Sequence, residues 1–206
     1  MDRADDHAGK GRRVSAFWSW LLSLFGRRPA APASSVEHFD EALAILERLE
    51  GGWSDHPADR GGATNRGVTQ LTYDRWRAAH GLSPRSVREL TDAERRALYL
   101  GDYWQPSAAG YLVRRLALAQ FDAAVHHGPT RAIRLLQEAL GVPVDGVYGP
   151  ITASAAAQVI NERATLTRML DYRRGLMRAI CAADPAQYVF FDGWMNRIDR
   201  LQEAIG

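Results

Sequence analysis

The chain has 206 residues, of which 46% are hydrophobic and 24% are charged, and its formal net charge is +2. This composition is typical of a globular protein of one domain or two small ones. The small net charge gives no reason to expect a nucleic-acid-binding protein, which needs a clustered basic surface. The single cysteine, Cys181, excludes an internal disulfide framework and a cysteine-rich metal site.

Residues 1–26 are predicted to combine a disordered segment with a short apolar helix. The apolar run VSAFWSWLLSLF at 14–25 is flanked by arginine pairs and is shorter than the ~20 residues that span a bilayer. Three interpretations stay open: a helix in the membrane interface, a signal-peptide core with a cleavage site at 31–33, or a helix packed on the protein itself. We favour the interfacial helix, bound to lipid.

Residues 27–36 are rich in proline, alanine and serine and are predicted to form a linker. Most of the remaining chain has helical periodicity. The expected helices cover 36–50, 69–82, 83–104, 111–128, 129–141, 151–163, 164–182 and 193–206. The glycine-rich segment 53–69 is expected to be a loop or a small hairpin, and 142–150 a turn. The fold class is therefore predicted to be mainly α.

Two expected helix starts have a capping residue. Thr69 or Thr72 can cap the helix at 69–82. The sequence TDAE at 91–94 is a capping-box pattern and is expected to open a helix.

Glu50 ends the first expected helix and is followed by Gly51 and Gly52. The negative end of a helix dipole disfavours an ionised carboxylate, which would raise the pKa of Glu50. Trp53 can place an apolar face beside it, with the same effect. A carboxyl that stays protonated near neutral pH is what a general acid in glycoside cleavage needs. The alternative is a solvated glutamate at a helix end.

A general acid needs a partner across the sugar, either an ionised carboxylate or a carboxylate and a hydroxyl that hold a water. Asp59 and Thr64 follow in the glycine-rich segment, and Asp55 is a rival for the carboxylate. The alternative is that these side chains bond their own backbone, as Asp and Thr often do in loops.

The stretch EGGWSDHPADRGGATNRGVT at 50–69 resembles the signature of glycoside hydrolase family 108, the bacterial and phage N-acetylmuramidases. The positions that match are Glu50, Gly51, Gly52, Asp59, Gly61, Gly62, Ala63, Thr64, Asn65, Gly67 and Thr69. Trp53 and Val68 replace the usual tyrosine and isoleucine. The resemblance implies that Glu50 is the catalytic acid. The spacing is also similar to that of phage T4-type lysozymes, which implies that Asp59 and Thr64 hold the water.

Segments 121–152 and 190–199 are similar to the second half of the same family, often described as a peptidoglycan-binding domain. His126 and His127 stand where the family often has Asn-Ser. The resemblance covers about 36–202 and implies a lysozyme-like helical fold. It divides the chain into a muramidase domain at 37–120 and a peptidoglycan-binding-like region at 121–206 packed on it.

The resemblance implies a peptidoglycan hydrolase of the cell envelope or periplasm, either an endolysin or a secretion-associated muramidase. It would cleave the β-1,4 bond between N-acetylmuramic acid and N-acetylglucosamine, without a cofactor and as a monomer. The substrate-binding candidates are Trp53, Asn65, Tyr73 and His126. Two alternatives are a lytic transglycosylase, which needs no water-holding Asp and Thr, and a non-catalytic peptidoglycan-binding secretion helper, which would not need Glu50.

A metal site is not expected. His126 and His127 are adjacent, so on a helix they point about 100° apart and do not share one metal easily. His56 and Asp59 have no third ligand nearby in the sequence. The turn VDGVYGP lacks the spaced carboxylates of a calcium loop, and Cys181 is expected to be buried.

Overall fold

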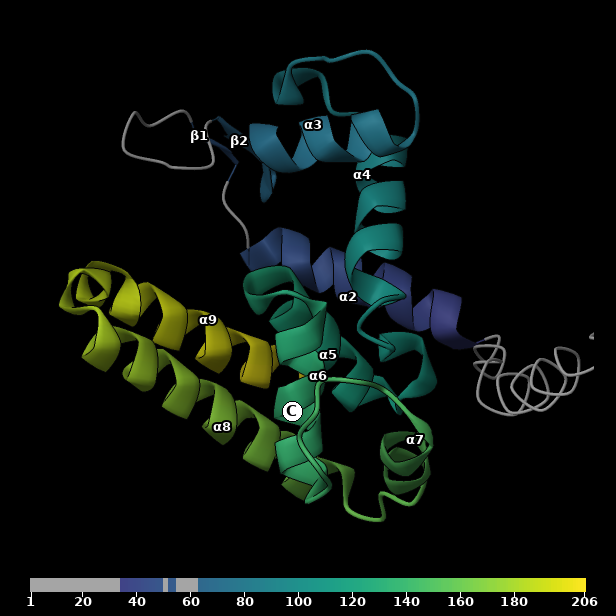
Figure 1. Ribbon diagram of the computed structural model, residues 1–206, viewed down its shortest axis with the longest axis vertical. Helices are drawn as coiled ribbons and strands as arrows, with labels where there is room; N and C mark the ends of the chain where they lie inside the picture. The colour runs from purple at the N-terminus through teal and green to yellow at the C-terminus, as the bar shows by residue number, and fades with distance from the viewer. Residues whose placement is uncertain (1–33, 50–51, 55–62) are drawn as a thin grey trace, which may run out of the picture. The chain divides into compact units, whose positions relative to one another are not determined.

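The computed structural model describes residues 34–49, 52–54 and 63–206 (Figure 1). The predictions for residues 1–26 and for most of the linker concern residues outside these ranges. The same is true of Glu50, Asp55 and Asp59. Most of the described chain is helical, as the hydrophobic periodicity predicts, and the fold is mainly α.

Helix α2 (Ser34–Leu49) is amphipathic and buries one face in the core. A small antiparallel sheet follows it, with β1 (Trp53–Ser54), β2 (Thr64–Asn65) and β3 (Val68–Thr69) in that order. The expected hairpin is thus the β2–β3 pair, and β1 adds a third strand. The connecting residues Arg66 and Gly67 have φ angles of 49° and 80°. Positive φ at both positions is typical of a two-residue type I′ turn, which favours glycine at the second.

Helix α3 (Gln70–Ala79) is capped by Thr69, whose side chain accepts a hydrogen bond from the Thr72 backbone N–H. Thr69 is therefore the cap, of the two threonines considered. The segment 83–104 contains η1 (Val87–Glu89), α4 (Asp92–Tyr99) and the π-helical η2 (Leu100–Trp104). Helix α4 is the helix expected to open at TDAE, and the capping box of Thr91 and Glu94 is present in full.

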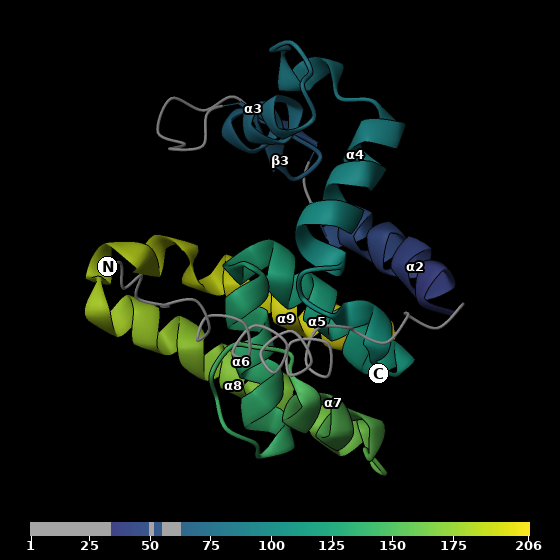
Figure 2. The ribbon, with the colours of Figure 1, turned by 45° about the vertical axis from the view of Figure 1, so that its right-hand side comes forward.

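After η3 (Ala109–Tyr111), the helices α5 (Arg114–His127) and α6 (Pro129–Leu140) follow each other with only Gly128 between them. Proline opens α6 and also α7 (Pro150–Ala157), at the helix position where its missing N–H costs nothing. Helices α8 (Glu162–Ala183) and α9 (Tyr188–Ile205) lie side by side and are joined by η4 (Pro185–Gln187) (Figure 2). Helix α9 begins at Tyr188, earlier than the predicted start at 193.

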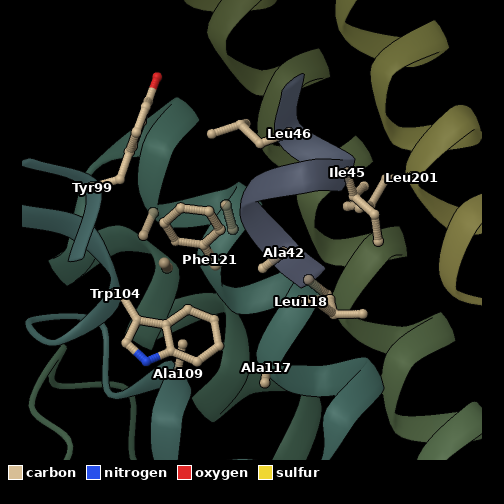
Figure 3. Packing of buried hydrophobic residues seen from close by; sticks show 14 of the residues in the cluster. Ala42, Ile45, Leu46, Tyr99, Trp104, Ala109, Ala117, Leu118, Phe121 and Leu201 are labelled. Atoms are coloured by element: carbon tan, nitrogen blue, oxygen red, sulfur yellow. The ribbon is translucent and has the colours of Figure 1, made fainter. Parts of the chain in front are cut away.

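Helix α5 lies at the centre of the core and packs against α2, α6, α8 and α9. Phe121 of α5 is 1% exposed and lies between α2 and Trp104 of η2 (Figure 3). Its ring meets those of Phe39 and Trp104 edge to face, with centroids 5.8 and 5.6 Å away. Burying a side chain of this size contributes about 1.5–3 kcal/mol, so this cluster fixes α2, and with it the start of the small sheet, on α5.

Cys181 is buried, as expected. Among the described residues, no helix has the length and apolar character needed to cross a membrane.

Candidate functional site

Thr64 lies in the middle strand of the small sheet, between two paired neighbours. It is opposite Ser54 of β1 and Thr69 of β3. The β2–β3 turn is joined to the start of α4 through its own Arg66, whose guanidinium is 2.5 Å from the Asp92 carboxylate. The backbone that carries Thr64 is therefore fixed on both sides. In the sequence, Glu50 comes directly after α2 and three residues before Trp53 of β1.

Trp53 is the exposed aromatic residue of the sheet, with 41% of its surface accessible. The guanidinium of Arg88 in η1 lies 4.9 Å from the centroid of its ring. A cation–π contact of this kind contributes about 0.5–1 kcal/mol at an exposed site and fixes the ring orientation. An oriented, accessible indole is suited to stacking on a sugar ring, and sequence reasoning did not identify Arg88 as its partner.

Asn65 binds the protein through its side-chain amide. Its Nδ2 donates to the backbone oxygens of Val87, at 3.0 Å, and Arg88, at 3.4 Å. These bonds attach β2 to η1, the element that carries Arg88. The amide nitrogen of Asn65 is therefore engaged in positioning the Arg88–Trp53 pair, rather than presented to a substrate.

Tyr73 does not present its ring to a substrate, because it is 0% exposed. Its hydroxyl donates to Glu94 at 3.0 Å and accepts hydrogen bonds from Arg77 and Arg85. Burial raises the pKa of Glu94, but hydrogen bonds from Thr91 and Tyr73 and the charge of Arg85 outweigh it and lower the pKa to about 2. Tyr73 thus joins α3 to the start of α4, and its place among the substrate-binding candidates does not agree with the structure.

His126 lies at the end of α5, beside a buried ionic cluster. Nη1 of Arg173 is 2.5 Å from Oδ2 of Asp122, and Nη2 of Arg197 is 2.8 Å from Oδ1 of the same carboxylate. Burial raises the pKa of Asp122, but the two guanidinium groups lower it to about 2. Asp122 lies in the segment 121–152 that resembles the family's second half, and its two arginine partners come from α8 and α9.

Arg173 also holds both histidines in their neutral form. Its Nη2 is 3.1 Å from Nδ1 of His126, and its Nε donates to Nε2 of His127 at 3.2 Å. Because an arginine can only donate, both ring nitrogens accept. Burial and the charge of Arg173 lower the pKa of His126 to about 4 and that of His127 to about 3. Each ring therefore carries its proton on the other nitrogen.

The half-buried His126 also borders aromatic side chains of α9. Its ring is 6.0 Å from that of Trp194, which in turn stacks at 6.0 Å on Phe190, a residue that is 54% exposed. The spacing of Phe190 and Trp194 by four residues is the signal that could have identified this pair. No group of three or more potential metal ligands occurs among the residues described.

Two family models match the chain in succession. The first, Glycosyl hydrolase 108, covers residues 43–128 and includes the end of α2, the sheet and α5. The second, described as "Predicted Peptidoglycan domain", covers 131–199. None of the curated proteins matches the chain.

Among solved structures, that of Brucella abortus SagA is similar to this chain. It has 31% sequence identity and a TM-score of 0.68, and the match covers 81% of this chain and 92% of that one.

Proposed function

The chain belongs to glycosyl hydrolase family 108, a family of peptidoglycan hydrolases, and from this premise we propose a specific bond and a set of catalytic residues. The bond is the β-1,4 link between N-acetylmuramic acid and N-acetylglucosamine. The protein is a glycoside hydrolase whose partner is peptidoglycan, so it acts in the cell envelope. The observation that carries the proposal is the family match over 43–128, which spans the end of α2 and the whole small sheet.

Glu50 is the proposed general acid. It follows Leu49, the last residue of α2, where the partial negative charge of the helix end favours a protonated carboxyl. In the reaction Glu50 gives its proton to the glycosidic oxygen, so that the departing sugar leaves as an alcohol rather than an alkoxide. Gly51 and Gly52 carry no side chains, which leaves room for the sugar beside the carboxyl.

Asp59 and Thr64 are the proposed pair that positions and activates the attacking water. Support for Thr64 comes from its place in the middle strand, where pairing with Ser54 and Thr69 fixes its backbone. A fixed hydroxyl can orient a water at low entropic cost. Asp59 supplies the negative charge that removes the proton of the water, and Asp55 is the alternative carboxylate.

Trp53 is the proposed sugar-stacking residue, with Arg88 behind its ring. Asn65 acts on the substrate indirectly, because it fixes the segment that carries Arg88. His126 is the second proposed contact. Its Nδ1 faces Arg173, so the proton on Nε2 is the donor that it can offer to a sugar oxygen.

The experiment that tests the reaction is mass spectrometry of the soluble muropeptides released from purified sacculi. Hydrolysis is expected to give products with a reducing muramic end, whose mass exceeds that of the corresponding 1,6-anhydro product by one water. Products with a 1,6-anhydro muramic end would show that the muramic 6-hydroxyl attacks instead of water. In that case the enzyme is a lytic transglycosylase, and Asp59 and Thr64 have no catalytic part.

The proposed setting is lysis by a phage endolysin or wall opening during secretion, by a monomeric enzyme. The apolar run at 14–25, flanked by Arg12, Arg13, Arg27 and Arg28, supports attachment to the inner membrane as an interfacial helix. A reporter fused to residues 1–35 should sediment with membranes and be released by detergent. A reporter that stays wholly in the soluble fraction would contradict the attachment.

A further inference from the structure

Two adjoining hollows lie along α6 and share Arg131 and Arg134. The first, of about 390 Å³, is bounded by the start of α6 and by His127. The second, of about 420 Å³, lies between α6 and α8 and is bounded by Leu135, Glu138, Asp171, Tyr172, Gly175 and Leu176. We call the two together the α6–α8 groove. Its lining residues from Arg131 onward belong to the region that matches the peptidoglycan domain, and His127–Thr130 precede that region.

The second hollow is lined by charged side chains of both signs. Arg131 and Arg134 are exposed where the two hollows meet, and within the described chain neither forms an ion pair. Asp145, on the adjoining turn, is hydrogen-bonded to Gln137 and the Val147 backbone, and these bonds, together with the charge of Arg134, lower its pKa. Glu138 follows Arg134 by about one turn of α6, and Asp171 of α8 lines the same hollow, where it is 3.0 Å from Arg174.

The rest of the second hollow is mostly apolar. Leu135 is buried in its floor, Leu176 is partly buried, and the ring of Tyr172 is 44% exposed. Gly175 places no side chain into this space. A ligand that fits must therefore combine negative charge, small apolar groups and a positive charge.

The turn at Gly146 limits the freedom of Arg134. Gly146 has a φ of 80°, and a Cβ atom there would lie only 3.0 Å from Nε of Arg134 and 2.9 Å from Cγ2 of Thr130. The turn is itself fixed, because the Gly146 N–H donates to Oε1 of the buried Gln137 at 2.8 Å. Arg134 is thus confined between this turn and α6, which lowers the entropy that it loses on binding a ligand.

We propose that the α6–α8 groove binds the peptide stem of peptidoglycan. The stem is a short peptide that carries several carboxylates, alanine methyl groups and, in strands with a diamino acid, a free amine. Its carboxylates bind Arg131 and Arg134, whose planar guanidinium groups match a carboxylate with two hydrogen bonds. Its methyl groups contact Leu176 and Tyr172, and its amine lies near Glu138 and Asp171.

The glycan itself fits this groove less well, because an N-acetylglucosamine unit has no charge to pair with two adjacent arginines. An anionic membrane surface also fits poorly, because Glu138 and Asp171 would face it. The proposal rests on the proposed function, since it assigns the uncleaved part of the same polymer to a second site. A peptide bound there would hold the enzyme on the wall while the glycan is cut.

The test is a calorimetric titration of the full chain with a sugar-free stem tetrapeptide, L-Ala-γ-D-Glu-meso-diaminopimelyl-D-Ala. We expect the double variant R131Q/R134Q to bind this peptide at least ~10-fold more weakly than the wild type, as loss of two charge-assisted contacts implies. Arg178→Gln is the matched control, because Arg178 is an exposed arginine of α8 outside the groove. It should bind like the wild type, and amidation of the peptide's carboxylates should abolish binding.

Three results would overturn the proposal: no heat of binding with wild-type protein, equal affinity of R131Q/R134Q and wild type, or complete displacement of the peptide by millimolar inorganic phosphate. The last would mark a general anion site. Failure of the proposed function can be told apart from failure of this proposal, because glycan cleavage is measured on strands stripped of their peptides. There R131Q/R134Q should cut at the wild-type rate, whereas on intact sacculi its KM should rise at unchanged kcat.

Discussion

Arg173 and Asp122 form an ion pair inside the protein, with Nη1 and Oδ2 2.5 Å apart and side chains only 1% and 5% exposed. Arg197 binds the second oxygen of the same carboxylate from α9. One side chain of α5 thus holds α8 and α9 together. Because Asp122 is the carboxylate that the buried Arg173 faces, its removal leaves that guanidinium without its ion-pair partner.

The first prediction follows from this cluster. Asp122→Ala should lower the free energy of unfolding by about 3–5 kcal/mol, the usual cost of breaking a buried pair from one side. Urea denaturation followed by circular dichroism measures this. Asp171→Ala, which removes an exposed carboxylate 3.0 Å from Arg174, is the control and should cost less than about 1 kcal/mol. Equal losses in the two variants would contradict the structural role of Asp122.

The second prediction concerns pH. The folded-state pKa values of His126, about 4, and His127, about 3, are both below the ordinary value of 6.5. Above pH 6.5 the two histidines are neutral in both the folded and the unfolded protein. Below it, they bind protons in the unfolded chain but not in the folded one. Stability must therefore fall as the pH drops from 6.5 to about 5.

Thermal unfolding between these pH values measures the effect. The double variant H126Q/H127Q should lose most of the slope, since its amides do not titrate. Asp122 and Glu94, whose folded-state pKa is about 2, stay ionised in the folded protein, so they add to the slope only near and below pH 5, where the unfolded carboxyls begin to bind protons. If H126Q/H127Q kept the same dependence of stability on pH, that dependence would come from groups other than these histidines.

The third prediction concerns the proposed acid. Glu50→Gln should reduce the lysis of sacculi by about 10²–10⁴-fold, the usual contribution of a general acid, without changing the unfolding temperature. Glu37→Gln is the matched control, because Glu37 is exposed in the first turn of α2. Lysis by Glu50→Gln near the wild-type rate would remove Glu50 from the mechanism.

The fourth prediction separates the two candidate carboxylates. Asp59→Asn should lose at least ~10²-fold in kcat, because its amide cannot take a proton from water. Asp55→Asn should stay near the wild-type rate. The rate is measured as the fall in turbidity of a suspension of sacculi, and the reverse pattern would give Asp55 the role of the base.

The fifth prediction concerns Trp53. Trp53→Ala should lower kcat/KM by about 5- to 30-fold, equivalent to about 1–2 kcal/mol of lost stacking. Arg88→Gln should produce a smaller loss of the same kind, because it only releases the ring. Initial rates on soluble glycan fragments measure both. A larger effect of Arg88→Gln than of Trp53→Ala would show that Arg88 itself contacts the substrate.

Much of the fold was predictable because its signals are local. The capping box at Thr91 and Glu94 and the proline at the start of α6 each fix a helix boundary within one turn of chain. The start of α9 at Tyr188 was missed, since Tyr188, Val189 and Phe190 are apolar but exposed, and exposure is not visible in a sequence.

The site was predictable only in part. Motif residues could be aligned with a family signature, but Tyr73 was chosen as an aromatic without knowledge of its burial. The partners that decide what a residue does come from distant segments. Val87 lies 22 residues from Asn65, and Arg173 lies 51 residues from Asp122. Such pairings depend on how the helices pack, which no local pattern records.

Helix α5 belongs by sequence to the first family match, yet it packs against helices of both. The boundary predicted after residue 120 falls within this helix. Neither matched region could therefore be removed or replaced by that of another protein without exposing the apolar faces that α5 covers. The enzyme should melt in a single cooperative transition, and a new wall specificity must arise by substitutions in place rather than by module shuffling.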